Sequence, residues 1–420
     1  MYPHFIQIIV NNNEKVVQKD SASLWYLLTF FLKIGSISFG GFLALISVIQ
    51  REMVIKDKRI EDQTILDGIT LASLLPGPLA VNTVCFIGYK LKGFWGAILS
   101  MVAVIFPSFI CLVVLTHLYY QFGEIENVRK VLNILMPAIV AIIFTVGVNM
   151  TKKHVVNWKQ YLIGAISIAA LQVIGGVLTT IVLILLGGLI GFIFFQESNI
   201  NEDKSVGNSN KLRFYPSSLV KNLVIIVLSF VLLLLSSYLW DPTGQVFKLN
   251  MNIFGVFSGM SVTLFGGGYV IIPIIQELIV DNLHWLSLED FNVAITLSQI
   301  TPGPILVSAT FIGYKIGGIF GAIIATVSIF FPSGILMIFL SHSIEQIKHT
   351  AWIKAIFTGI RPVIIGLIFS AAITISISVF TGWFLVGLFF LFTLLILKYN
   401  LSSIQVILAG LAIGIITIVT

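Results

Sequence analysis

The chain has 420 residues, of which 57% are hydrophobic and 10% are charged, and its mean hydropathy is +1.04. Soluble domains carry about 25% charged residues, so this composition excludes an ordinary soluble domain. The net charge of +6 comes largely from short segments between apolar runs, where basic residues bias membrane orientation, and it does not indicate nucleic-acid binding. We expect an all-α polytopic protein embedded in the lipid bilayer of the plasma membrane.

Apolar runs predict the helices in chain order. Residues 1–23 form a polar amino-terminal segment that lacks the pattern of a cleavable signal peptide. The expected helices of a first unit are 24–50, 64–75, 79–90, 94–120, 130–150, 160–174 and 178–195. The Asn- and Ser-rich stretch 196–218 is expected as a linker. One additional helix, at 219–239, then precedes a second unit.

An internal repeat defines the two units. The segment FGGFLALISVIQ (39–50) matches FGGGYVIIPIIQ (265–276) at an offset of 226, and Pro76-Gly77-Pro78 matches Pro302-Gly303-Pro304 at the same offset. Phe106-Pro107-Ser108 similarly pairs with Phe331-Pro332-Ser333. Chance similarity between apolar segments would not keep glycines and prolines in register. The predicted domains are therefore the segment 1–23, a first repeat at 24–195, the linker 196–218, and 219–420 with the additional helix and the second repeat.

One homologous loop differs in charge between the copies. Residues 277–289 contain no Lys or Arg, whereas residues 51–63 contain Arg51, Lys56, Lys58 and Arg59. Basic loops remain in the cytoplasm, so the first loop is expected inside and the second outside. The repeats would then be inverted about an axis in the membrane plane, as in many secondary transporters. The unmatched helix 219–239 fits an inversion if each unit crosses an even number of times.

The linker gives the opposite signal. It carries Lys204, Lys211 and Arg213, which favour the cytoplasm, where an inverted arrangement could put it outside. The comparison of paired loops carries more weight in this prediction.

Each copy interrupts an apolar run with Pro-Gly-Pro, although a proline inside a helix costs about 3 kcal/mol. In a membrane such a break is tolerated only where protein or a water-filled cavity surrounds it. Pro78 and Pro304 are expected at the first position of a second half-helix, which accepts proline. The free amides after them, together with the helix dipole, would bind an anion. Paired breaks near the membrane midplane therefore predict a substrate site between inverted repeats.

The expected substrate-binding residues lie at these breaks, at the glycine motifs and at one intramembrane cation. They are Lys33, Phe39, Gly40, Gly41, Pro76, Gly77, Pro78, Asn82, Phe265, Gly266, Gly267, Pro302, Gly303, Pro304 and Ser308. A lysine inside an apolar run is a site candidate by default, although snorkelling to the interface explains Lys33 equally well. For Lys90 and Lys315 a capping role at a half-helix end is favoured over substrate contact.

Enzyme and pump motifs are missing from the sequence. The six histidines and two cysteines form no metal-ligand spacing, and there is no H-E-x-x-H motif, Walker A loop or pair of carboxylates inside a helix. We therefore expect no metal, no cofactor, no enzymatic activity and no ATP-driven pumping.

The duplicated Phe-Gly-Gly and Pro-Gly-Pro motifs, with Gly88-Tyr89 and its counterpart, resemble the chromate transporter family in its long two-domain form. The resemblance covers nearly the whole chain outside the termini and the linker. It implies two oppositely oriented membrane domains and export of chromate by alternating access, driven by an ion gradient such as that of protons. Sulfate, a tetrahedral dianion of similar shape, is the expected competitor or related substrate. A homo-oligomer is a further expectation.

Two other functions remain open at this point. The stretch TPGPILVSATFIGYKIGG (301–318) also resembles the start of lysine-exporter-type amino-acid exporters, which are single short units without this duplication. An anion channel would use the same backbone chemistry as a carrier, and dependence on the proton-motive force would separate the two.

Overall fold

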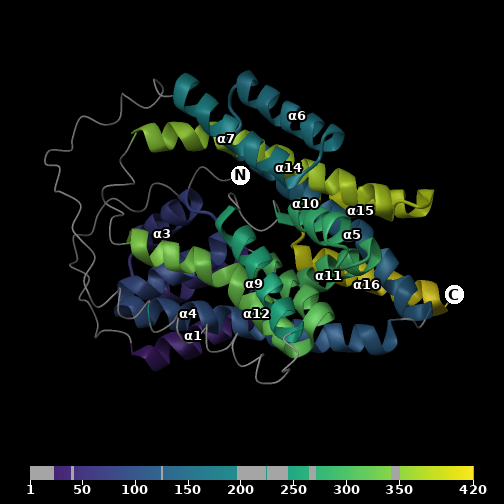
Figure 1. The fold of residues 1–420 in the computed structure, drawn as a ribbon, viewed down its shortest axis with the longest axis horizontal. Coiled ribbons are helices and arrows are strands. Elements are labelled where there is room, and N and C mark those ends of the chain that lie inside the picture. Colours follow the sequence, from purple (N-terminus) through teal and green to yellow (C-terminus); the bar gives the residue numbers. More distant parts are fainter. Residues whose placement is uncertain are drawn as a thin grey trace, which may run out of the picture.

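The computed structural model describes residues 23–38, 42–123, 126–195, 224, 245–263, 271–341 and 351–419. Every regular element in these ranges is helical, which confirms the all-α class (Figure 1). Among these residues, helices long and apolar enough to cross a membrane lie at Leu79–Phe122, Lys130–His154, Ile305–Ser341 and Ala355–Val379. Shorter apolar helices lie at Leu24–Ile37, Leu178–Phe194, Trp383–Tyr399 and Ser403–Thr417.

The two repeats have matching orders of elements. The first contains α1 (Leu24–Ile37), α2 (Phe42–Ile49), the π-helix η1 (Gln50–Lys56), α3 (Asp62–Leu74), α4 (Leu79–Phe122), α5 (Glu126–His154), α6 (Trp158–Val173) and α7 (Val177–Phe194). The second contains α9 (Gln245–Thr263), α10 (Ile271–Ile275), η4 (Gln276–Asn282), α11 (Leu288–Ile300), η5 (Ile305–Val307), α12 (Ser308–Ser341), α14 (Ala351–Val379), α15 (Trp383–Tyr399) and α16 (Ser403–Val419).

Two sequence expectations change. The single helix expected at 24–50 is wrong, because α1 ends at Ile37 and a separate helix begins at Phe42. Glycine favours such a boundary because it lowers helix stability. The additional helix expected at 219–239 lies outside the described residues, apart from Val224.

In the first repeat, α3 and the beginning of α4 form an antiparallel hairpin. A Cβ atom on Gly68 would lie 2.9 Å from Cδ1 of Phe86 and 3.3 Å from Cγ2 of Thr83. In one continuous helix Gly68 and Phe86 would be about 27 Å apart, at 1.5 Å per residue. The chain therefore folds back at residues 75–78, which form the tip of the hairpin.

The second repeat folds back in the same way between α11 and α12. Nζ of Lys315 lies 3.7 Å from Oδ2 of Asp290, although 25 residues separate them along the chain. Residues 301–304 form the tip of this second hairpin. The Lys315–Asp290 pair lies at its base, near the start of α11.

Each long helix turns sharply once more after the hairpin. The backbone is non-helical at Lys92-Gly93 in α4 and at Gly317-Gly318 in α12, and Gly93 and Gly318 share a φ of 61° and a ψ of −150°. These turns agree with the predicted boundary between 90 and 94. Beyond them the chain runs back so closely that a Cβ atom on Gly88 would overlap the Gly96 carbonyl.

The repeats interlock through their later helices. Equivalent helices α5 and α14 pack against each other, with Gly147 beside Phe369 and with Ile139 and Ile375 lining one cavity. The residue numbers fall on α14 as they rise on α5, so these two helices run antiparallel. In Figure 1, α7 of the first repeat lies along α14 of the second. In the same way, α16 of the second repeat packs against α5 of the first, where Gly410 lies beside Leu135.

Candidate substrate site at the Pro-Gly-Pro tips

Each hairpin tip contains a glycine in a conformation that other residues rarely adopt. The φ angle is +105° at Gly77 and +117° at Gly303. A Cβ atom on Gly77 would overlap Ser333 of α12, and one on Gly303 would overlap Ser108 of α4. Both the backbone angle and the close approach therefore require glycine at the middle of each Pro-Gly-Pro.

Two hydrogen bonds join the tip of the second hairpin to the first repeat. The hydroxyl of Ser108 donates to the carbonyl oxygen of Pro302. The N–H of Gly303 donates to the carbonyl oxygen of Ser38, directly after α1, at 3.0 Å. Because Ser108 lies near the middle of the leg of α4 that follows the kink, these contacts lie deep within the helical assembly.

The tip of the first hairpin lies against the second repeat in the corresponding way. Gly77 faces Ser333, whose N–H donates to Oγ of Ser261 on α9 at 3.3 Å. Ser333 and Ser108 occupy equivalent positions in the two repeats. Each tip is thus bordered by a serine from the opposite repeat.

The first turn after each tip carries a buried polar side chain. Nδ2 of Asn82 donates to the Pro76 carbonyl at 3.2 Å, while Oδ1 of Asn82 has no hydrogen-bond partner. Ser308 has the matching position in the second repeat, and its Oγ also lacks a partner. Both residues are 0% exposed. Buried polar atoms without partners are costly, so these two positions are marked for a ligand or for water.

The prolines expected at the first helical position are each one residue earlier, so that prediction is wrong. Pro78 is the N-cap of α4 and Pro304 the N-cap of η5. The two starts also differ, because the N–H of Asn82 closes an α-helical turn onto Pro78 whereas that of Val307 closes a 3₁₀ turn onto Pro304. In both repeats the first amides of the helix still face the tip.

The lysines named from sequence lie away from the tips. Lys33 is on the exposed side of α1, opposite the buried Leu27 and Phe31, and makes no hydrogen bond or ion pair with another described residue. Lys90 is exposed, with Nζ 5.5 Å from the centre of the Phe86 ring. Lys315 is at the base of its hairpin with Asp290, whose Oδ1 accepts a hydrogen bond from the Tyr119 hydroxyl at 3.1 Å.

The glycine motifs expected to complete the site cannot be placed. Phe39, Gly40, Gly41, Phe265, Gly266 and Gly267 lie outside the described residues. The residues flanking them include Ser38, whose contact with Gly303 brings the end of α1 to the second tip.

Three serines of this site were not predicted. They are Ser38, Ser108 and Ser333. A signal for two of them was present in the sequence, because Phe-Pro-Ser recurs in register in both repeats.

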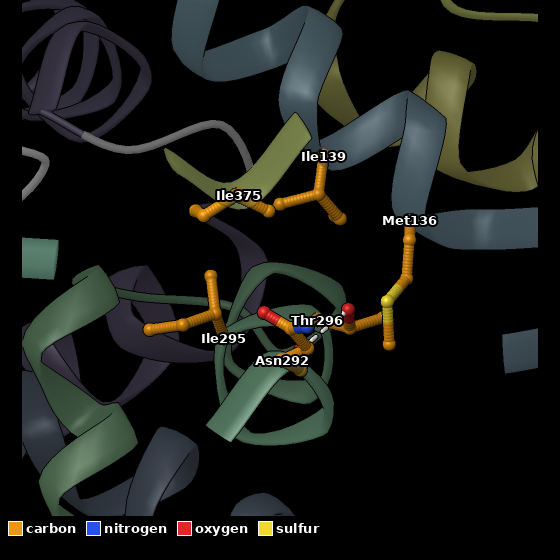
Figure 2. A pocket seen from close by; sticks show the side chains of 6 residues that line it. All are labelled: Met136, Ile139, Asn292, Ile295, Thr296 and Ile375. Carbon is orange, nitrogen blue, oxygen red and sulfur yellow. Dashed lines mark hydrogen bonds between the residues drawn. The ribbon is translucent and has the colours of Figure 1, made fainter. Parts of the chain in front are cut away.

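A small cavity lies elsewhere, between α5, α11 and α14 (Figure 2). Asn292 and Thr296 supply its polar groups, and Nδ2 of Asn292 donates to Oγ of Ser378 at 3.2 Å. The remaining lining is apolar, from Met136, Ile139, Ile295 and Ile375. None of the residues expected to bind substrate lines this cavity.

The chain matches the family model described as chromate transporter over two segments, residues 25–192 and 251–415. These segments span both repeats and both hairpin tips. The chain belongs to the chromate transporter family. It is therefore a multi-pass membrane transport protein, and membership of the chromate transporter family does not favour the amino-acid exporter.

Curated relatives align with this chain over most of their length. A chromate transport protein of Cupriavidus metallidurans is 27% identical over 358 residues, covering 84% of this chain and 83% of the relative. A chromate transport protein of Pseudomonas aeruginosa is 26% identical over 395 residues, covering 91% and 90%. An uncharacterized transporter of Methanocaldococcus jannaschii is 28% identical over 411 residues, covering 96% and 97%. No solved structure matches this chain.

Proposed function

We propose that this protein is a secondary transporter that exports chromate by alternating access, with sulfate as a competitor and the proton gradient as the driving force. The observation that carries the proposal is the reciprocal contact at the tips, where Ser108 borders Gly303 and Ser333 borders Gly77. A site built equally from two repeats is what alternating access by movement of one repeat against the other requires.

The proposed site binds an oxyanion through donors at two helix starts. The N–H groups that begin α4 and η5 precede the first helical hydrogen bonds, which run from Asn82 to Pro78 and from Val307 to Pro304, and the helix dipole favours negative charge there. The buried hydroxyl of Ser308 adds a further donor. Tetrahedral oxyanions present several oxygens, so donors arriving from opposite repeats can bind one ion together.

In this proposal the first repeat, 24–195, and the second repeat, which follows the additional helix within 219–420, are inverted in the membrane. The antiparallel packing of the equivalent helices α5 and α14 supports this arrangement, since repeats of the same orientation would present these helices in parallel. The basic residues of 51–63 and the absence of Lys and Arg from 277–289 support it independently.

A count of membrane crossings offers an explanation for the basic residues of the linker. Because the α3–α4 hairpin returns to the side it entered, the proposed crossings of the first repeat are the second part of α4 and the helices α5, α6 and α7. If α1 and η1 likewise begin and end on one side, as the hydrogen bond of 2.5 Å from the Tyr26 hydroxyl to Oδ2 of Asp57 suggests, the crossings are even in number. The linker 196–218 then lies on the same side as 51–63, where its basic residues belong.

Vesicle transport tests the proposal. Purified protein reconstituted in liposomes should accumulate labelled chromate when a proton gradient is imposed, and unlabelled sulfate should compete while lysine should not. Flux that persists unchanged without the gradient would favour a channel. Flux of lysine with none of chromate would favour an amino-acid exporter.

A further inference from the structure

We infer that the substrate form bound at the first tip is an oxyanion that carries a proton, hydrogen chromate rather than the chromate dianion. This inference rests on the proposed function and concerns the protonation state of its substrate. It begins from the orientation of Asn82, the fully buried amide in the first turn after Pro76-Gly77-Pro78.

The Pro76 carbonyl fixes which way the Asn82 amide faces. A carbonyl oxygen can only accept a hydrogen bond, so the group 3.2 Å from it must be the NH₂ of Asn82 and not its oxygen. Rotating the amide by half a turn would bring two acceptors together. The Oδ1 atom is therefore directed away from Pro76, and it is an acceptor buried without a partner.

A ligand that occupies this position in place of water must supply a donor to Oδ1 of Asn82. The chromate dianion offers only oxygen lone pairs, so it would leave Oδ1 of Asn82 unpaired and repel it. A singly protonated oxyanion has one O–H, which can donate to Oδ1 while its other oxygens accept from backbone amides. Export of this form carries one proton outward with the anion, so the inward proton gradient can drive it only if more than one proton returns for each ion exported.

The second repeat carries a different residue at this position, so the two halves of the site differ in the hydrogen bonds they can make. Ser308 stands in place of Asn82, and its unpartnered hydroxyl can donate as well as accept. The ligand's protonated oxygen thus belongs at Asn82 and an unprotonated oxygen at Ser308. Asn82 selects the protonated form, and Ser308 contributes binding without that selection.

The helices next to the first tip carry titratable side chains, and the titration of three of them must be separated from that of the substrate. They are Asp67 on α3, Cys85 on α4 and Lys33 on α1, and the one side-chain hydrogen bond of Asn82 goes to Pro76. Sulfate and selenate stay fully deprotonated near neutral pH, where chromate gains its first proton. A pH effect that arises in the protein would alter binding of all three ions.

The test measures flux of labelled chromate into liposomes at a subsaturating concentration, with equal pH on both sides and a fixed membrane potential. Flux should follow the hydrogen chromate fraction and fall about tenfold per pH unit once the dianion dominates, since apparent affinity scales with the competent fraction. Phosphate, which keeps a proton at neutral pH, should compete at least about tenfold better than sulfate or selenate. Competition by sulfate should not change across this pH range.

Two variants complete the test. Asn82→Ala should abolish the preference for phosphate over sulfate, whereas Ser308→Ala should weaken all oxyanions alike and keep the preference. Chromate flux that is independent of pH, or sulfate that competes as well as phosphate in the unmodified protein, would overturn the inference while chromate transport itself stands. If no chromate moves at any pH, the proposed function fails instead.

Discussion

The hydroxyl of Ser108 on α4 donates a hydrogen bond to the carbonyl of Pro302, 194 residues further along the chain. This bond joins the spanning leg of one repeat to the hairpin tip of the other. Both residues are buried, so removal of the hydroxyl leaves the Pro302 carbonyl without this hydrogen-bond partner. The contact therefore links the stability of the assembly to the geometry of the candidate site.

Replacing Ser108 tests this link. Ser108→Ala should lower the free energy of unfolding by about 1–3 kcal/mol, because it leaves the buried Pro302 carbonyl unsatisfied, and it should reduce chromate flux. Ser333→Ala is the matched control, since the Ser333 hydroxyl donates at 3.1 Å to Phe330 within its own helix and its loss should cost less. Thermal unfolding in detergent measures both, and equal melting temperatures would contradict the role given to Ser108.

The tip glycines should tolerate no side chain. We expect Gly77→Val and Gly303→Val to insert into the membrane but to transport nothing, because each side chain would overlap a serine of the opposite repeat at a φ that valine rarely adopts. Gly93→Ala is the control for backbone strain alone, because Gly93 has a positive φ but an added Cβ would meet no atom within 4 Å. We expect it to lower the free energy of unfolding by about 1–3 kcal/mol. Full flux in either valine variant would mean that the tips serve only as bends.

Orientation can be measured by labelling. Single cysteines at Lys58 and Asn282, in a background lacking Cys85 and Cys111, should react with an impermeant maleimide from opposite sides of the membrane. Lys58 lies two residues after η1 and Asn282 is the last residue of η4, and these equivalent segments differ in charge. Labelling from the same side would exclude inverted repeats.

The role of Lys33 remains a prediction. If its ammonium neutralises an oxyanion on the way to the tips, Lys33→Gln should weaken chromate and sulfate flux and Lys33→Arg should retain part of it. The exposed position of Lys33 on α1 is equally suited to snorkelling, in which case both variants transport normally. Flux in protein shown to be correctly inserted decides between the two.

The sequence predicted local breaks better than it predicted long-range partners. Pro-Gly-Pro marked the positions where α3 and α11 end, because proline and glycine act on their own backbone. The partners of Ser108 and Ser38 depend on how two repeats fold against each other, which no local pattern encodes. The apolar run around Lys33 indicated that this residue lies within a membrane helix, but not which side of the helix carries it. The spacing of Leu27, Phe31 and Ile34, which form the buried side of α1, contained that information.

The backbone contacts between Gly88 and Gly96, and between Gly313 and Gly321, constrain how the molecule can move. At each contact two antiparallel legs touch without an intervening side chain, so they cannot slide past one another without colliding or opening a void in the packing. The returning leg of each hairpin and the spanning leg after it should therefore move together as one rigid body. The bending during a transport cycle then falls on the short segments 75–78 and 301–304, where the substrate itself would bind.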